Sequence, residues 1–295
     1  MLGTDRPPPL IVDAVGHSFG GTPALDGCSF VVPAGAVVAL LGRNGAGKTT
    51  LMRAVAGLLR PLRGQISVFG RPAGAVLPRW AYVDQRAPLY PMLTVAQTLR
   101  LGARLNPGWD AAYATRVAEA GALPADARVG TLAAGQRSWL AFAMALGKRA
   151  GLLVLDEPMA GLDPVARAEF TSTLMAEVAD RGTAVLMSSH VVADIEGVCD
   201  HVVVLGGGRV RLAAEVDRSL DEHRVAAGAV RDIGELDGLD VVELRRYDRD
   251  FTALVRAGGP RTGALSWHRP SLEELLLAYL RLGAAPRPAE EVVTA

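Results

Sequence analysis

The sequence predicts an α/β protein built around a mainly parallel sheet, and two patterns support this prediction. Short, continuous apolar runs are typical of strands that are buried on both faces. They occur at 36–42, 151–157 and 183–190. Stretches with helical spacing separate these runs, at 48–58, 111–121, 136–147 and 165–181. Apolar strands that alternate with helices form parallel sheets with helices on both faces.

The regions before and after this core have a different character. Residues 10–30 contain short strand-like runs broken by Gly and Pro, and YVDQ, which ends at Gln85, follows a predicted fourth strand. HVVVLGGGRVRLA, from 201, predicts a hairpin with a Gly turn, and 224–257 alternates apolar and polar residues. We therefore predict a large domain over 1–215 and a small α+β subdomain over 216–295.

A helix is predicted near the end of the chain, at 269–282. Ser271 caps it and Glu274 occupies the capping-box position. The helix carries one apolar side, the C-terminal stripe, which we expect to pack within the small subdomain, with a partner-binding face as the alternative. This stripe consists of Leu272, Leu275, Leu276 and Tyr279. Residues from 283 onward are rich in Pro, Ala and Glu and predict a flexible tail.

Composition excludes several classes of protein. Lys+Arg and Asp+Glu number 31 each, so a strongly basic nucleic-acid-binding surface is not expected. Cys28 and Cys199 are far apart and form no CxxC pair, which argues against a disulfide framework or a zinc site. No apolar run approaches the roughly 18 residues that would predict a membrane-spanning helix. Any role at a membrane is therefore expected to act through a partner.

A phosphate-binding loop is predicted at 42–50, where GRNGAGKTT matches the pattern G-x-x-x-x-G-K-[ST]. The loop follows a predicted buried strand and opens a predicted helix, which is the context that the motif requires. Gly42, Gly45 and Gly47 let the backbone bend so that its N–H groups surround a phosphate. Such a loop indicates a nucleotide with a β-phosphate.

The side chains that follow these glycines complete the loop. Lys48 is expected to reach the β- and γ-phosphate oxygens. Thr49 offers a hydroxyl group to Mg²⁺, and Thr50 can hydrogen-bond the α-phosphate.

Acidic and histidine residues lie at the ends of two later apolar strands. Asp156 can hold Mg²⁺, and Glu157 can polarise an attacking water molecule as a general base. Asp163, in AGLDP, can also be a simple helix N-cap before Pro164. His190 ends the 183–190 run, and without its context it would be read as a structural histidine.

The base of the nucleotide is expected to be adenine. Guanine recognition usually relies on an Asn-Lys-x-Asp motif, and the chain has only Asn44 and Asn106, neither of them in that setting. A base held by stacking needs an aromatic ring. Phe19, before the first strand, is the candidate, and a core Phe is the alternative.

The whole set of motifs resembles the ATP-binding subunit of an ABC transporter, a P-loop NTPase. The resemblance covers roughly residues 10–215 and implies an antiparallel β subdomain and a helical subdomain at about 88–150. RPSLEELLLAYL, at the C-terminal helix, resembles ATPases of drug- or antibiotic-type exporters. The motifs, in chain order, are GRNGAGKTT, YVDQ, LAAGQ, LLVLDEP, AGLD and SSH.

The resemblance also implies a role for each matching residue. Gln85 would sense Mg²⁺ and touch the membrane subunit, Asp163 would lie in an inter-subunit loop, and His190 would contact the γ-phosphate. The implied catalytic residues are Glu157, His190, Lys48 and Gln85, and the implied Mg²⁺ residues are Thr49, Gln85 and Asp156. The implied ATP-binding residues are Phe19, Gly42, Asn44, Gly45, Ala46, Gly47, Lys48, Thr49, Thr50, Leu132, Ala133, Ala134, Gly135, Gln136, Asp156 and Asp163.

LAAGQ, at 132–136, is a degenerate form of the family signature LSGGQ. Ala133 replaces a Ser whose hydroxyl would donate to the γ-phosphate, and such a bond is worth roughly 1.5–3 kcal/mol. Ala134 replaces a Gly, and its Cβ crowds the phosphate. Trp139 and Met144 replace two Arg residues of the helix that follows.

The resemblance implies partners as well as ATP and Mg²⁺. Transmembrane permease subunits and a second ATPase subunit are expected, at the cytoplasmic face of the cell membrane. The weak signature suggests a mixed dimer with a chain that bears a complete signature, and a homodimer with two slow sites is the alternative. Two other functions stay open, namely a soluble ABC-type ATPase acting on nucleic acid or ribosomes and a weakly hydrolysing regulatory module.

Overall fold

A computed structural model describes residues 7–73, 79–256 and 263–282. Its core is a six-stranded sheet with the order β10-β9-β3-β8-β7-β6. In this sheet β9, β3, β8, β7 and β6 pair with one another in parallel, whereas the edge strand β10 pairs antiparallel with β9. The strands are β3 (Val37–Gly42), β6 (Trp80–Val83), β7 (Leu152–Leu155), β8 (Ala184–Ser189), β9 (His201–Gly206) and β10 (Arg209–Glu215). The predicted parallel sheet, the strand before Gln85 and the Gly-turn hairpin are confirmed.

The apolar runs are continuous because both faces of this sheet are covered. In β7, Leu152 and Val154 face one hydrophobic cluster, whereas Leu153 and Leu155 face another. The first cluster fills the space under a second, four-stranded antiparallel sheet of order β2-β1-β4-β5 and under helix α1 (Lys48–Val55). These strands are β1 (Leu10–Phe19), β2 (Thr22–Val32), β4 (Arg63–Val68) and β5 (Arg71–Pro72).

Four helices cover the other face of β6, β7 and β8. They are α2 (Val95–Leu105), α3 (Ala111–Ala120), α4 (Ala134–Gly147) and α5 (Pro164–Arg181). The sequence predicted α3, α4 and α5 to within two residues at each end, but it did not predict α2. The N-cap of α2 is Thr94, which forms a capping box with Gln97. That Thr-x-x-Gln spacing is the signal that would have located this helix.

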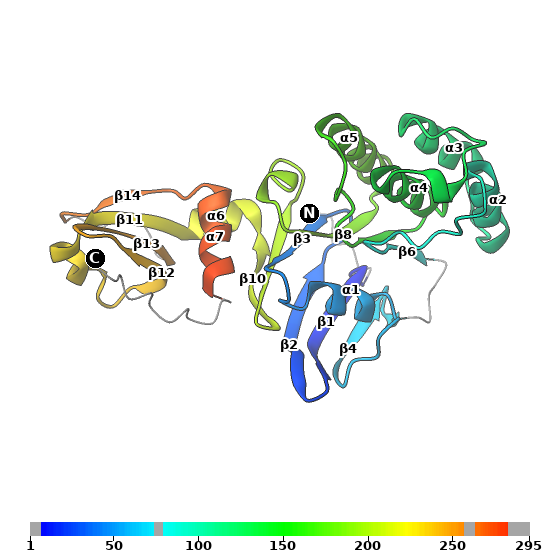
Figure 1. Cartoon of the computed structure of the whole chain (residues 1–295). Helices are drawn as coiled ribbons and strands as arrows, with labels where there is room; N and C mark the ends of the chain where they lie inside the picture. The colour runs from blue at the N-terminus through cyan, green and yellow to red at the C-terminus, as the bar shows by residue number, and fades with distance from the viewer. Residues whose placement is uncertain (1–6, 74–78, 257–262, 283–295) are drawn as a thin grey trace, which may run out of the picture.

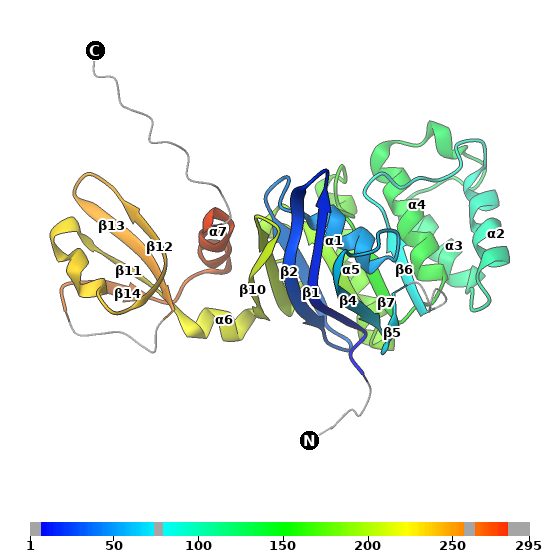
Figure 2. The ribbon, with the colours of Figure 1, turned by 90° about the horizontal axis from the view of Figure 1, so that it is seen from below.

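The C-terminal part of the chain forms a third sheet beside β10, at the opposite end of the molecule from α2 and α3 (Figures 1 and 2). It is antiparallel, with the order β12-β13-β11-β14. Its elements are α6 (Val216–Glu222), β11 (His223–Ala229), β12 (Asp240–Arg246), β13 (Asp250–Arg256), β14 (Ser266–His268) and α7 (Leu272–Leu282). The predicted tail from 283 lies outside the described residues, and the boundary between 215 and 216 stays a prediction.

The C-terminal stripe packs more widely than predicted. Ser271 and Glu274 form the predicted capping box at the start of α7. The stripe itself, however, joins one cluster with Leu41 of β3 and Val204 of β9 as well as with Leu254 of β13. The stripe thus packs within the small subdomain, as expected, and also against the core sheet, which was not expected. Alternate residues of β3 leave an apolar face uncovered at this end of the core sheet, and α7 covers it.

Candidate functional site

The loop at 42–50 connects β3 to α1 and can exist only with glycine at two of its positions. A Cβ at Gly42 would lie 2.7 Å from the Leu205 carbonyl oxygen, and a Cβ at Gly47 would lie 2.5 Å from that of Ala24. Gly45 and Gly47 have φ values of +80° and +104°, in the region that favours glycine. Among the described residues no side chain caps the start of α1, so its first N–H groups can bind an anion.

Lys48 lies across the inner side of this loop. Its side chain is only 8% exposed, and its Nζ donates a hydrogen bond of 2.6 Å to the Gly42 carbonyl oxygen. The same Nζ is 3.9 Å from Glu157 Oε1. The ammonium group therefore joins the loop to the acidic pair that follows β7, although these segments are far apart in the sequence.

Asp156 is fully buried at the end of β7. Ser188 Oγ donates a 2.7 Å hydrogen bond to its Oδ1, whereas Oδ2 has no hydrogen-bond partner among the described residues. Burial raises the pKa of this carboxyl group, and Ser188 and the nearby Thr49 hydroxyl, which stops short of a full hydrogen bond, partly offset that effect. A buried carboxylate oxygen without a partner is costly unless a cation or a donor reaches it.

Glu157 is held in place by its backbone. Its φ is +50°, an uncommon value for a side chain that has a Cβ, and its N–H donates to Ser188 Oγ at 2.8 Å. This turn leaves the carboxylate 11% exposed, with Oε2 2.7 Å from Nδ1 of the exposed His190. Strained residues of this kind persist where the surrounding structure determines them, often at functional sites. The structure thus brings Lys48, Glu157 and His190 into contact.

Ser188 is the residue of this cluster that sequence reasoning missed. Its hydroxyl group accepts from the Glu157 N–H and donates to Asp156, so it fixes both acidic residues relative to β8. The signal was present, because the apolar run 183–190 ends in Ser-Ser-His and the C-terminal ends of neighbouring parallel strands share one edge of the sheet.

Two predicted site residues stand apart from this cluster. Gln85 is exposed after β6, and its side chain makes no hydrogen bond within the described part of the chain. Phe19 is 56% exposed and packs edge-on against His17, with ring centroids 4.7 Å apart. Phe19 ends β1, so its predicted place before the first strand is wrong. Its exposure argues against the core-Phe alternative and leaves the ring free to stack on a base.

The signature residues and Asp163 form a second cluster. Ala133 is the N-cap of α4 and has no side-chain oxygen. Among the described residues, the capping bond that remains runs from the Ala133 N–H to Gln136 Oε1, at 3.0 Å. Gly135 approaches the Gly161 carbonyl so closely that a Cβ would lie 2.8 Å from it. Asp163 Oδ1 accepts from two N–H groups of α5, both at 2.9 Å, as the N-cap alternative predicted.

The first cluster fits a magnesium nucleotide. The loop supplies positive-φ glycines and uncapped N–H groups for phosphate, Lys48 supplies a buried cation, and Asp156 Oδ2 supplies an unpartnered acceptor. The second cluster makes no hydrogen bond or ion pair with the first in the described ranges. The two clusters are therefore separate within one chain.

Comparison with known proteins identifies the family. The family model described as ABC transporter matches residues 25–160. The Nod factor export ATP-binding protein I of Bradyrhizobium diazoefficiens is 33% identical over 261 residues, which cover 85% of this chain and 83% of the relative. The chain belongs to the ABC transporter ATP-binding proteins. It is therefore an ATP-binding ABC-type ATPase.

Other relatives of this ABC ATPase differ in the direction of transport that their names state. Arabinose import ATP-binding protein AraG 1 of Burkholderia cenocepacia is 32% identical over 93% of this chain and 55% of the relative. A solved ATP-binding subunit of an ABC transporter is 29% identical, with a TM-score of 0.65 over 71% of this chain and 91% of that chain. Within the described residues, no helix of this ABC ATPase has the length and apolar character needed to cross a membrane.

Proposed function

We propose that this ABC ATPase binds and hydrolyses Mg²⁺·ATP to drive export through separate membrane subunits. The observation that carries the proposal is the contact of Lys48, Glu157 and His190 beneath the phosphate loop. Phosphoryl transfer uses a cation for the phosphates and a base that orients the nucleophile, and here His190 contacts that base. Among possible cargo classes we favour a drug, an antibiotic, a lipid or a similar compound.

The ATP site divides into four roles. Phe19 would stack on adenine. Asp156, the Thr49 hydroxyl and Gln85 would hold Mg²⁺, which would supply positive charge against the phosphates. The loop that surrounds the phosphates consists of Gly42, Asn44, Gly45, Ala46, Gly47, Lys48, Thr49 and Thr50. Leu132, Ala133, Ala134, Gly135, Gln136 and Asp163 form the face offered to the nucleotide of a second subunit.

Hydrolysis is assigned to Glu157. Its carboxylate can take a proton from a water molecule that attacks the γ-phosphate, and His190, 2.7 Å away, holds that carboxylate in position. Lys48 now donates to the Gly42 carbonyl, and it would transfer that hydrogen bond to phosphate oxygens. The Glu157 backbone needs no rearrangement for this, because Ser188 already anchors its N–H.

A second ATPase subunit completes each site in this proposal. The phosphate loop of one chain faces the α4 N-terminus of another, which agrees with two half-sites that do not meet within one chain. Ala133 and Ala134 weaken only the face offered to the partner, so a mixed dimer with a complete second signature is favoured over a homodimer. Such an assembly would lie at the cytoplasmic face of the membrane, on transmembrane permease subunits.

The C-terminal part of the chain favours export. The Nod factor export ATP-binding protein I of Burkholderia lata is 35% identical over 91% of this chain and 96% of the relative, so the match extends past residue 215. Arabinose import ATP-binding protein AraG 1 also covers 93% of this chain, so the preference for export rests on the resemblance of RPSLEELLLAYL to exporter ATPases. A nucleic-acid role receives no support, since the formal net charge is zero.

Measuring small molecules on both sides of the membrane tests the direction of transport. Cells that carry Glu157→Gln in place of the native chain should accumulate at least one compound inside and lose it from the medium. Cells with an exposed-site control, Glu119→Gln, should match the wild type. A compound that instead persists in the medium and is depleted inside would establish import and contradict the proposal.

A further inference from the structure

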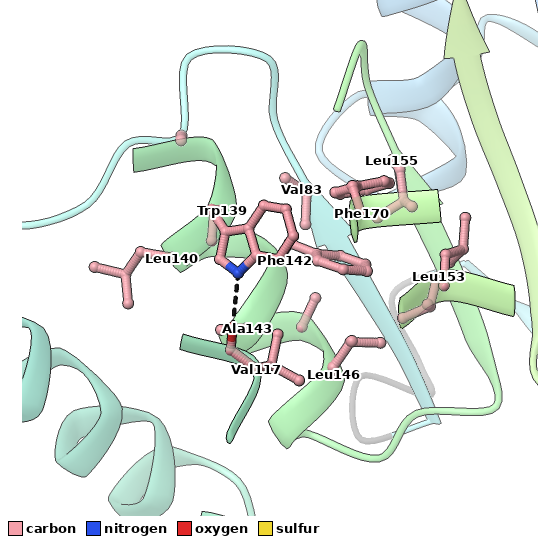
Figure 3. Close-up of a cluster of buried hydrophobic side chains, with 14 of the residues drawn as sticks. Val83, Val117, Trp139, Leu140, Phe142, Ala143, Leu146, Leu153, Leu155 and Phe170 are labelled. Carbon is pink, nitrogen blue, oxygen red and sulfur yellow. Dashed lines mark hydrogen bonds between the residues drawn. The ribbon is translucent and has the colours of Figure 1, made fainter. Parts of the chain in front are cut away.

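Trp139 connects the signature helix to two other helices. Its side chain is 2% exposed, and Nε1 donates a 2.7 Å hydrogen bond to the Val117 carbonyl oxygen in the last turn of α3. On its other side the ring lies edge-on to Phe142 of α4 and Phe170 of α5, with centroids 6.3 and 6.1 Å away. Figure 3 shows the indole N–H directed at Val117 with both phenyl rings beside it.

A glycine makes this arrangement possible. A Cβ at Gly121 would overlap the five-membered ring of the indole, so the end of α3 admits the Trp139 ring only because residue 121 lacks a side chain. The same ring lines a hollow of about 440 Å³ between the starts of α4 and α5. Truncating it would enlarge an existing hollow, whereas Phe keeps most of the ring and removes the N–H group.

The position of Trp139 in the helix relates it to the signature. Trp139 lies one turn after Gly135 in α4, and Phe170 lies two turns after Asp163 in α5. The contact between the Trp139 and Phe170 rings therefore holds the two helices together just beyond the point where Gly135 approaches Gly161. Ala133 has no side-chain oxygen with which to cap the first turn of α4. Most helices have an N-cap side chain that stabilises the first turn, but the first turn of α4 depends on tertiary packing instead.

We propose that Trp139 is a positioning residue that holds Gly135 and Gln136 against the Gly161–Asp163 loop, in place of the missing cap at Ala133. This proposal rests on the proposed function, in which the α4 N-terminus faces the nucleotide of the second subunit. Within the described residues, Trp139 makes no hydrogen bond with the phosphate-loop cluster of its own chain. Its effect is therefore confined to turnover and does not extend to ATP binding at the phosphate loop.

A double-mutant cycle with Ala133→Ser tests this role. Trp139→Phe should lower kcat about five- to tenfold, leave the Kd for ATP of the separate subunit unchanged within about twofold, and speed amide exchange at 135–138 about fivefold. In the Ala133→Ser background, where a hydroxyl caps the turn, each effect should shrink below about twofold. If the effects of the two substitutions simply multiply, the positioning role is wrong.

The matched control is Trp80→Phe. Trp80 is also buried, and its Nε1 has no hydrogen-bond partner in the described part of the chain, so the same substitution should change neither kcat nor exchange at 135–138. Equal effects of the two Trp substitutions would overturn the inference. Lys48→Ala tests the proposed function separately from the role of Trp139. If ATP binding is unchanged in that variant, the proposed function is wrong. Exchange at 135–138 still reports on Trp139 in that event.

Discussion

At the scale of single residues, the site is determined mainly by strand ends. Asp156, Glu157 and His190 follow buried strands, so their convergence could be predicted from the chain alone. The φ of +50° at Glu157 and the double role of Ser188 could not, because both depend on how far β7 and β8 are offset. Gln85 and Phe19 were identified only through the family resemblance, and their roles stay predictions.

The buried charge at Asp156 predicts a gain in stability on neutralisation. Burial raises the pKa of its carboxyl group, so the ionised form destabilises the nucleotide-free fold once the pH rises through that raised value. Asp156→Asn keeps an acceptor for Ser188 Oγ and should raise the Tm of the nucleotide-free protein by about 2–4 °C at neutral pH, as a gain of about 1 kcal/mol would.

Thermal unfolding with and without Mg²⁺·ATP provides the measurement. The nucleotide should stabilise the wild type but give Asp156→Asn much less protection, since the proposed ligand for Mg²⁺ is lost. Asp217→Asn, at an exposed position on α6, should behave as the wild type. A lower Tm for Asp156→Asn without nucleotide would show that the charge is already compensated.

At the scale of elements, the start of α4 was predicted from the sequence, but its contacts with α3 and α5 were seen only in the structure. The degenerate signature could be recognised from LAAGQ and its place before Asp156. What the replacement at 139 does could not be predicted, because the indole contacts Val117 and Phe170 from other helices. Tertiary contacts of this kind have no local sequence pattern.

Restoring the signature separates the two dimer forms. Ala133→Ser combined with Ala134→Gly returns a hydroxyl donor and removes a Cβ, which in a homodimer would raise ATPase kcat about tenfold. Because the mixed dimer is favoured, we expect the purified protein alone to show no such rise. Steady-state phosphate release by the purified protein measures it. If the rate does not change, and activity appears only when a second ATPase subunit is added, the mixed dimer is the working form.

The stability of the protein should depend on pH through His223, which lies between α6 and α7. His223 is 1% exposed, with Nδ1 2.7 Å from the Ser219 carbonyl oxygen and Nε2 2.9 Å from Tyr279 Oη. Burial lowers the pKa of this histidine from 6.5, so the folded ring stays neutral while the unfolded chain takes up a proton. The stability present above about pH 6.5 is then lost as the pH falls toward the folded pKa.

His223→Gln tests this dependence. As the pH falls from 7.5 to 5.5, the free energy of unfolding should decrease less steeply in the variant than in the wild type. The difference in slope should correspond to at most one proton taken up on unfolding. Urea titrations across that range give the slope. His268→Gln, at an exposed histidine, is the control, and an unchanged slope in His223→Gln would show that the pKa of the His223 ring is the same in the folded and the unfolded chain.

At the scale of the whole molecule, α7 ties the C-terminal sheet to the nucleotide-binding core. The sequence predicted this helix and its apolar side but not the surface it covers, because Leu41 and Val204 lie 231 and 68 residues before Leu272 in the sequence. The view in Figure 2 shows α7 between the third sheet and β10. The two parts of the chain should consequently unfold together.

Leu276→Ala measures this coupling. The side chain is fully buried in the shared cluster, so the substitution should destabilise the protein by about 2–5 kcal/mol and lower the midpoints of both parts together. Hydrogen exchange followed in β3 and in β13 reports each part separately. Leu282→Ala, where the side chain is 45% exposed, should change little. Loss of protection in β13 alone would mean that the two parts are independent.

Turnover and nucleotide retention by Glu157→Gln test the catalytic assignment most directly. Gln at this position keeps the shape of the side chain but cannot accept a proton from water, so ATPase turnover should fall at least about 100-fold while ATP stays bound. Glu119→Gln, on the exposed side of α3, should turn over ATP as the wild type does. A Glu157→Gln protein that hydrolyses ATP at the wild-type rate would contradict the account.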